Sequence, residues 1–193
     1  MKIIMIQTAI AAALVGASAP AVAQSLPAAN IAVVDLEKVT AQCNACKSAN
    51  TALTSQVNSL RARQTALATP LETERKSIQA AVTALNGKAP DAALQARIAA
   101  FQTKGQQASQ EISRQEQQVQ RNQTYIQQQI AAKLGPIYQQ VMQRRGANVM
   151  LEVGSTLASA ASIDVSNDVL TALNVALTSV QTTAPAQAAP QGR

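Results

Sequence analysis

Two cysteines, Cys43 and Cys46, are the residues of this chain whose spacing could support covalent chemistry. A Cys-x-x-Cys pair occurs in thiol-disulfide oxidoreductases, in zinc sites and as a short structural disulfide. One chain cannot complete a tetrahedral zinc site without histidine or a second cysteine pair, although an oligomer could bring several pairs together. An oxidoreductase would need a βαβ scaffold around the motif, which the flanking sequence does not show. We therefore predict an intrachain disulfide at a helix start and no metal site.

The absence of histidine excludes further chemistry. No Ser-His-Asp or Cys-His nucleophile can form, and no imidazole can carry a proton. The sequence also has no glycine-rich phosphate-binding motif. Aromatic residues make up only 2% of the chain, which argues against a large compact core. We expect a protein that is not an enzyme and that uses no cofactor.

Residues 1–23 have the form of a cleavable signal peptide. A basic start at Lys2 precedes an apolar run, and Ala21-Val22-Ala23 has the small-x-small pattern that signal peptidase cleaves. A transmembrane helix is the alternative, but polar residues interrupt the run and no second long apolar segment follows. Gln24 would begin the mature chain, and no cysteine follows the cut to carry a lipid anchor. The expected location is the periplasm.

Apolar residues recur every seven positions in two long segments within residues 47–145, as in a coiled coil. The first segment carries Leu53, Val57, Leu60, Leu67, Leu71, Ile78 and Leu85, and the second carries Leu94, Ile98, Phe101, Ile112, Val119 and Ile126. The turn-forming sequence Asn-Gly-Lys-Ala-Pro-Asp at 86–91 separates them. This pattern predicts a long antiparallel helical hairpin over 47–145 with its tip at 86–91.

These heptad positions form the seam along which the two helices of the hairpin, or arm, would pack. Several of them hold polar or small residues, so the arm should bend easily. These are Gln64, Glu74, Gly105, Gln115 and Asn122. Asn50 suits the N-cap of the first helix. Thr69-Pro70-Leu71-Glu72 has the form of a new helix start, which predicts a kink or break near Ala68. The alternative is a continuous helix that bends at Pro70.

Residues 24–46 and 146–181 have a different character and are expected to form a small body that contains strands. Apolar β-branched runs predict strands at 31–35 and 148–153, with 162–165 as a candidate third. Ser166-Asn167-Asp168 should cap a following helix that carries Val169, Leu170, Leu173 and Leu177. The polar, proline-containing segment 182–193 is expected to be disordered.

The body has only 59 residues, too few for a stable core alone, so we predict an obligate oligomer whose strand edges pair between chains. The expected oligomerisation residues are Ile31, Val33, Val149, Leu151 and Val153.

The order of these elements resembles the OmpH/Skp family of periplasmic chaperones. Two segments carry the resemblance, Val-Asp-Leu-Glu-Lys at 34–38 and Ile-Asp-Val-Ser-Asn-Asp-Val-Leu at 163–170. The resemblance implies a mainly α fold, a homotrimer whose strands form a small central barrel, and three coiled-coil hairpins around a cavity. That cavity would hold unfolded outer-membrane β-barrel proteins. The family pattern does not include the two cysteines.

Charge follows the same division of the chain. Residues 47–145 carry 13 Lys plus Arg and 5 Asp plus Glu, whereas the rest of the mature chain is net acidic. Basic arms would attract acidic clients or an anionic membrane surface. A solvated coiled-coil face is the alternative, and export argues against a nucleic-acid partner. The candidate client-binding residues are Lys88 at the tip with Arg75, Lys76, Arg97 and Lys104.

Two functions therefore compete. The first is an ATP-independent holdase that captures unfolded outer-membrane proteins by shape, charge and apolar contact. The second is a structural coiled-coil adaptor of the cell envelope that binds a folded partner. A thiol-disulfide oxidoreductase is a third hypothesis, and it alone requires Cys46 for function.

Overall fold

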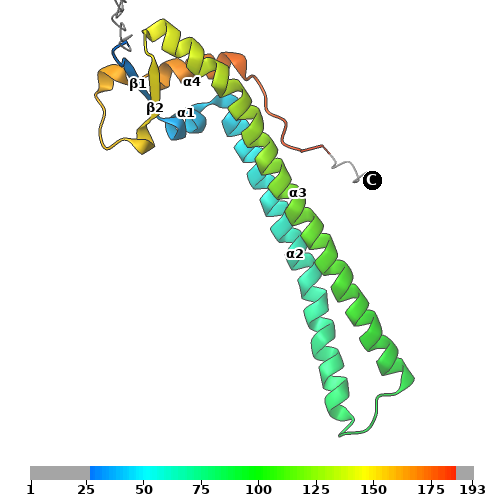
Figure 1. Ribbon diagram of the computed structural model, residues 1–193. Coiled ribbons are helices and arrows are strands. Elements are labelled where there is room, and N and C mark those ends of the chain that lie inside the picture. Colours follow the sequence, from blue (N-terminus) through cyan, green and yellow to red (C-terminus); the bar gives the residue numbers. More distant parts are fainter. Residues whose placement is uncertain (1–26, 186–193) are drawn as a thin grey trace, which may run out of the picture.

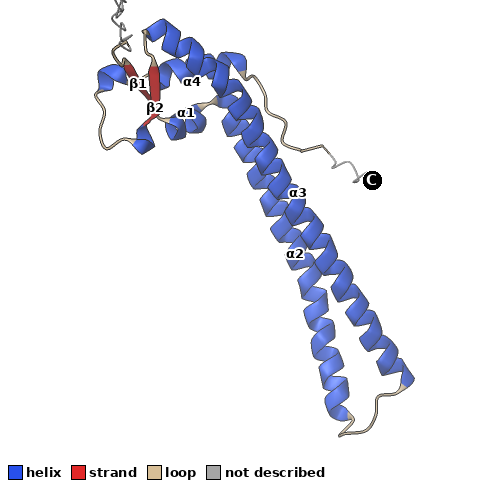
Figure 2. Ribbon diagram, viewed as in Figure 1, coloured by secondary structure: helices blue, strands red, loops and turns tan. Residues whose placement is uncertain are grey.

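The computed structural model describes residues 27–185. The segment expected to be a signal peptide lies outside the described residues. In Figure 1 a head region sits at one end of a long arm made by two helices. The elements are β1 (Ile31–Val34), α1 (Leu36–Gln42), α2 (Asn44–Ala84), α3 (Ala92–Arg145), β2 (Val149–Glu152), two 3-10 turns (Val153–Ser155 and Ala161–Ile163) and α4 (Ser166–Ala176). The predicted class, mainly helical with a small sheet, is confirmed (Figure 2).

The arm consists of α2 and α3, which lie side by side and are joined at the end far from the head (Figure 1). Between them Asn86 and Gly87 adopt positive φ values of 49° and 86°, which this dipeptide tolerates better than others. The carboxylate of Asp91 then caps α3 by accepting from the Leu94 N–H at 2.8 Å. The chain therefore turns where its local sequence disfavours a helix.

The expected break near Ala68 is wrong, because α2 continues through Pro70. Thr69 does not cap a new helix; its hydroxyl donates to the Thr65 carbonyl at 3.0 Å, one turn earlier. Proline removes one intrahelical N–H, but Pro70 is exposed, so water can satisfy the carbonyl that loses its partner. The start of α2 also differs from expectation, since Cys43 is the N-cap and Asn50 lies within the helix.

The head contains a two-stranded parallel sheet in which Ile31 pairs with Val149 and Val33 with Leu151. Parallel neighbours need a long crossover connection, and here α1 and the whole arm supply it. The candidate third strand at 162–165 is reduced to a bridge between Val33 and Asp164, with a 3-10 turn before it. Beside this bridge the Val165 N–H donates to the Val33 carbonyl at 2.9 Å.

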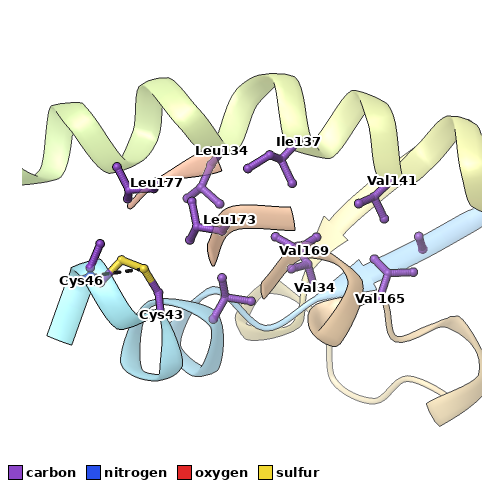
Figure 3. Close-up of a cluster of buried hydrophobic side chains, with 13 residues drawn as sticks. Val34, Cys43, Cys46, Leu134, Ile137, Val141, Val165, Val169, Leu173 and Leu177 are labelled. Atoms are coloured by element: carbon purple, nitrogen blue, oxygen red, sulfur yellow. Dashed lines mark hydrogen bonds between the residues drawn. A yellow bond between two sulfur atoms is a disulfide. The ribbon is translucent and has the colours of Figure 1, made fainter. Parts of the chain in front are cut away.

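The core lies where the base of α3 meets α4, α1 and β1, as Figure 3 shows. Val141 of α3 and Val169 and Leu173 of α4 are fully buried. Val39 of α1 is also fully buried, and Leu134, Ile137 and Leu177 complete the contact. Because α3 contributes to this cluster directly, the arm is anchored in the head.

The start of α4 is capped differently from the prediction. No side chain of 166–168 caps the helix; instead, the Asp164 carboxylate accepts from the Ser166 N–H at 2.8 Å. Asp168 pairs with Arg145 at the end of α3, with Nε and Oδ2 2.6 Å apart. Asp164 of the preceding loop thus caps α4 in place of Ser166, and Asp168 forms an ion pair with α3.

Residues 182–185, expected to be disordered, instead lie against the arm and form hydrogen bonds with it. The remainder of that segment, 186–193, lies outside the described residues.

Candidate functional site

Asp35, Asp164 and Ser166 join the two sequence segments that carry the family resemblance, 34–38 and 163–170. The Asp35 N–H donates to the Ser166 hydroxyl at 2.8 Å, and that hydroxyl donates to the Asp164 carboxylate at 2.5 Å. Asp35 in turn caps α1 by accepting from the Lys38 N–H at 2.8 Å. Ser166 is 1% exposed. The network therefore fixes the end of β1 against the starts of α1 and α4, and its role is structural.

The electrostatics of this network favour an ionised Asp164. Hydrogen bonds from the Ser166 hydroxyl and N–H, with a weaker attraction to Lys38, hold the pKa of Asp164 below its usual value. A carboxylate is therefore retained at neutral pH to accept both bonds.

The cysteine pair lies at the junction of α1 and α2 and forms part of the core (Figure 3). A bond joins the two Sγ atoms, and the Cα atoms are 5.2 Å apart. Cys43 Sγ also accepts from the Cys46 N–H at 3.2 Å. Cys43 is fully buried and Cys46 is 6% exposed, which shields the pair from a large redox partner.

Ion pairs within the arm occupy three of the five candidate client-binding residues. Arg97 of α3 forms a two-point contact with Glu74 of α2, with distances of 2.6 and 3.0 Å. Arg75 makes a similar contact with Glu72, and Lys76 Nζ lies 3.6 Å from the same carboxylate. The hydrogen bonds from Arg97 and Arg75 hold the pKa of their partner carboxyls below the usual value. These cations are therefore partly neutralised.

Lys88 and Lys104 have different surroundings. Lys88 is exposed in the turn at the tip, with no ion pair among the described residues. Lys104 borders a hollow of about 410 Å³ between α2 and α3, beside Leu67, Leu71 and Ala108. A second hollow of about 400 Å³ shares those three apolar residues and adds Gly105. Small side chains at Gly105 and Ala108 leave the seam underfilled and expose apolar surface there.

The expected oligomerisation residues differ in exposure. Ile31, Val149 and Leu151 are 43%, 37% and 39% exposed, which is high for large apolar side chains. Val153 is half-buried. Val33 is only 2% exposed because β2 and residue 164 flank it within the chain, so it is unavailable to a second subunit. Beyond β2, no further strand closes the sheet among residues 27–185.

Sequence reasoning missed a cluster of amides near the base of the arm. Gln56 of α2 and Asn122 and Gln129 of α3 bind the main chain of residues 181–184. The sequence identifies Asn122 only as a polar residue in the seam. Gln129 follows it by seven residues, and two amides at the same heptad position were the signal that could have indicated a polar contact.

Two features are absent from the described part of the chain. No helix among residues 27–185 is both long enough and apolar enough to cross a bilayer. Within the same residues, no three His, Cys, Asp or Glu side chains gather closely enough to hold a metal ion.

Comparison with known proteins finds one matching family and a solved structure with the same fold. A crystal structure described as an OmpH-like outer membrane chaperone from Caulobacter crescentus superposes with a TM-score of 0.67 at 16% identity. The alignment covers 85% of this chain and 96% of that one, so the two share a fold. No curated protein matches the sequence. The family described as "Outer membrane protein (OmpH-like)" matches residues 30–173, and the chain therefore belongs to the OmpH-like family.

Proposed function

We propose that this protein is an ATP-independent holdase chaperone of the periplasm that binds unfolded outer-membrane β-barrel proteins between its helical arms. The observation that carries the proposal is membership of the OmpH-like family, together with a fold shared with an OmpH-like outer membrane chaperone. In this proposal residues 1–23 direct export and the head, 24–46 with 146–181, assembles the oligomer. Residues 47–145 form the antiparallel coiled-coil arm that contacts the client.

The head supports assembly into an oligomer, and the resemblance to the OmpH/Skp family implies a homotrimer. β2 offers an unpaired edge among the described residues, and Val149 and Leu151 are exposed beside it. Unpaired strand edges favour pairing with another chain, and burial of these side chains would stabilise that contact. Three heads joined in this way would form a small barrel and direct three arms around one cavity.

The arm supports client capture by charge and by apolar contact. Residues 47–145 have a net charge of +8, while an exposed hollow lined by Leu67, Leu71 and Ala108 breaks the seam. An unfolded chain offers both carboxylates and apolar side chains, so it can use both features. Lys88 and Lys104 are the candidates free to meet it directly. Carboxylates already bind the other three candidates, Arg75, Lys76 and Arg97, so these contribute mainly to the positive electrostatic field of the arm.

The test is native mass spectrometry of the mature chain, 24–193, alone and after addition of an outer-membrane β-barrel protein diluted from urea. We expect a trimer that gains one unfolded client. The same β-barrel protein, folded beforehand in detergent, is the control and should not bind. A chain that ignores the unfolded client but captures a folded envelope protein would contradict the proposal and favour the adaptor function.

The electrostatic part has its own test. Client affinity should fall as ionic strength rises, because salt screens the field of the arms. Lys88→Gln should weaken binding by about two- to fivefold, the range of one exposed charge contact. Lys47→Gln removes the same charge at the base of the arm and is the matched control. Equal effects of the two variants would show that the tip has no special role.

A further inference from the structure

The segment that follows α4 lies extended along the base of the arm (Figure 1). Side-chain burial alternates along it. Val180, Thr182 and Ala184 are half-buried against the helices, whereas Gln181, Thr183 and Pro185 are exposed. This period of two is that of a β-strand, although no strand pairs with the segment. The arm therefore binds one face of an extended chain.

Three side-chain amides hold this segment through its main chain. Gln129 accepts from the Gln181 N–H at 3.0 Å and donates to the Gln181 carbonyl at 2.9 Å. Gln56 donates to the Thr182 carbonyl at 3.0 Å. The arm thus pairs with both polar groups of one residue and with the next carbonyl.

The third amide is the most constrained. Asn122 is 4% exposed, and its Oδ1 accepts from the Ala184 N–H at 2.8 Å. Its Nδ2 donates to Gln56 Oε1 at 2.7 Å, and Gln118 donates to its Oδ1 at 2.7 Å. Neighbouring side chains therefore hold Asn122 as well, and a side chain that is already oriented loses less entropy on binding.

None of the hydrogen bonds between the arm and residues 181–184 uses a side chain of that segment. Every polypeptide offers the same main-chain N–H and carbonyl groups. The contacts therefore select for an extended backbone with small or β-branched residues at alternate positions. Strands of outer-membrane β-barrels are also extended, and apolar and polar side chains alternate along them.

Free space continues beyond the bound segment. A hollow of about 650 Å³ adjoins Ala184 and Pro185 and is lined by Tyr125 and Arg121. A bound chain longer than residues 181–185 would therefore have room to continue along the arm.

We propose that Gln56, Asn122 and Gln129 form a binding site for extended polypeptide segments, which residues 181–185 occupy in the absence of client. An unfolded β-barrel protein would displace the segment and bind through its own main chain. The inference rests on the proposed holdase function for the identity of that ligand. A tethered segment competes at high effective concentration, so it lowers the apparent affinity of the site for any other chain.

The site itself can be tested without a client. A chain ending at Val180 keeps the core residue Leu177 and frees the three amides. A fluorescent peptide with the sequence of residues 178–185 should bind this shortened protein at least tenfold more tightly than the intact one. Equal affinity for both proteins would overturn the proposal and leave residues 181–185 as a structural strap.

Two matched comparisons test the main-chain contacts. A peptide N-methylated at the position of Ala184 loses the N–H that Asn122 accepts and should bind about tenfold more weakly. Methylation at Thr183 is the control, because that N–H makes no hydrogen bond within 27–185. In the shortened protein Gln129→Met should weaken binding similarly, and Gln123→Met should not. Equal effects of the paired changes would contradict main-chain recognition.

The intact protein provides a measurement that does not depend on the folding of any variant. Hydrogen exchange at the amides of Gln181 and Ala184 should accelerate when unfolded β-barrel protein is added in excess. Continued protection while native mass spectrometry shows bound client would overturn the shared site but leave the holdase function standing. If no client binds, the holdase proposal fails, and the peptide experiment still decides the site.

Discussion

At the scale of single residues, Ser166 joins more of the head than any local pattern indicates. Its hydroxyl accepts from the Asp35 N–H and donates to Asp164, and the residue is buried. Ser166→Ala should lower the free energy of unfolding by about 1–3 kcal/mol, because the Asp35 N–H would lose its partner. Urea unfolding at fixed protein concentration measures this. Ser162→Ala, at an exposed position, is the control, and an equal loss in both variants would contradict the role of Ser166.

Asp164 should make stability depend on pH in a defined direction. Its pKa in the folded protein is lowered from the usual 3.8, so ionised Asp164 stabilises the fold above that value. This contribution is lost as the pH falls below 3.8 and through the folded pKa. Asp164→Asn should therefore be less stable than wild type at pH 7, and the difference should shrink at low pH. Urea unfolding of both proteins at pH 7 and pH 3 tests this; a constant difference would contradict it.

The disulfide gives a third prediction at this scale. Denatured but unreduced mature protein should show no free thiol, because one bond joins Cys43 and Cys46. Reduction should cost only about 1–2 kcal/mol of stability, since the closed loop is very short. Cys46→Ser should leave client binding nearly unchanged under the holdase hypothesis. Two free thiols in the titration would contradict the bond, and loss of function in Cys46→Ser would favour an oxidoreductase.

Residue types were easier to predict than residue partners. The Asn86-Gly87 turn was a local signal in the sequence, and the structure has a turn there with positive φ at both residues. The pairing of Arg97 with Glu74 depends on how two helices align, which no local pattern specifies. For the same reason the sequence shows that Asn122 is a polar seam residue but not its hydrogen-bond partner, because Ala184 lies 62 residues away.

At the scale of elements, Pro70 shows how neighbouring structure outweighs a local stop signal. The sequence around it has a cap, a proline and a glutamate in the order of a helix start, yet α2 is continuous. Leu67 and Leu71 are half-buried along the seam on either side of the proline. Packing against α3 therefore holds the helix through a position where an isolated peptide would break.

Pro70→Ala should stabilise this part of α2. Alanine restores the N–H that proline lacks and removes an interior cost of up to about 3 kcal/mol. Amides near residue 70 should therefore exchange with solvent more slowly, while those near the base of the arm remain unchanged. Gln79→Ala, at another exposed position of α2, is the control for a general helix effect. Equal protection in wild type and Pro70→Ala would show that the proline costs nothing here.

The strands also show how far local sequence alone can predict an element. Apolar β-branched runs identified 31–34 and 149–152 closely, but residues 162–165 contribute a single bridge. The helix α4 begins at Ser166, so the chain leaves β1 directly after Val165. A four-residue run is too short for composition alone to distinguish a strand from a helix entry.

At the scale of the whole molecule, the head of one protomer has an incomplete surface. Val39, Val141, Val169 and Leu173 fill a small core, while Ile31, Val149 and Leu151 remain exposed over the two-stranded sheet. Two strands with one open edge are marginal in water. The arm cannot cover them, because it is anchored on the other side of the head through α3 (Figure 1). A second protomer is the simplest source of the missing contacts.

The double substitution Val149→Lys and Leu151→Lys should therefore convert the proposed trimer to monomer. Two charges on β2 would be buried without partners in the interface, whereas the isolated head already exposes these positions. Native mass spectrometry reads the oligomeric state, and far-UV circular dichroism shows whether the helices persist. Leu157→Lys is the control, because Leu157 is fully exposed in the loop after β2. A variant that keeps the wild-type oligomer would place the interface elsewhere, and the cavity between arms would then need another origin.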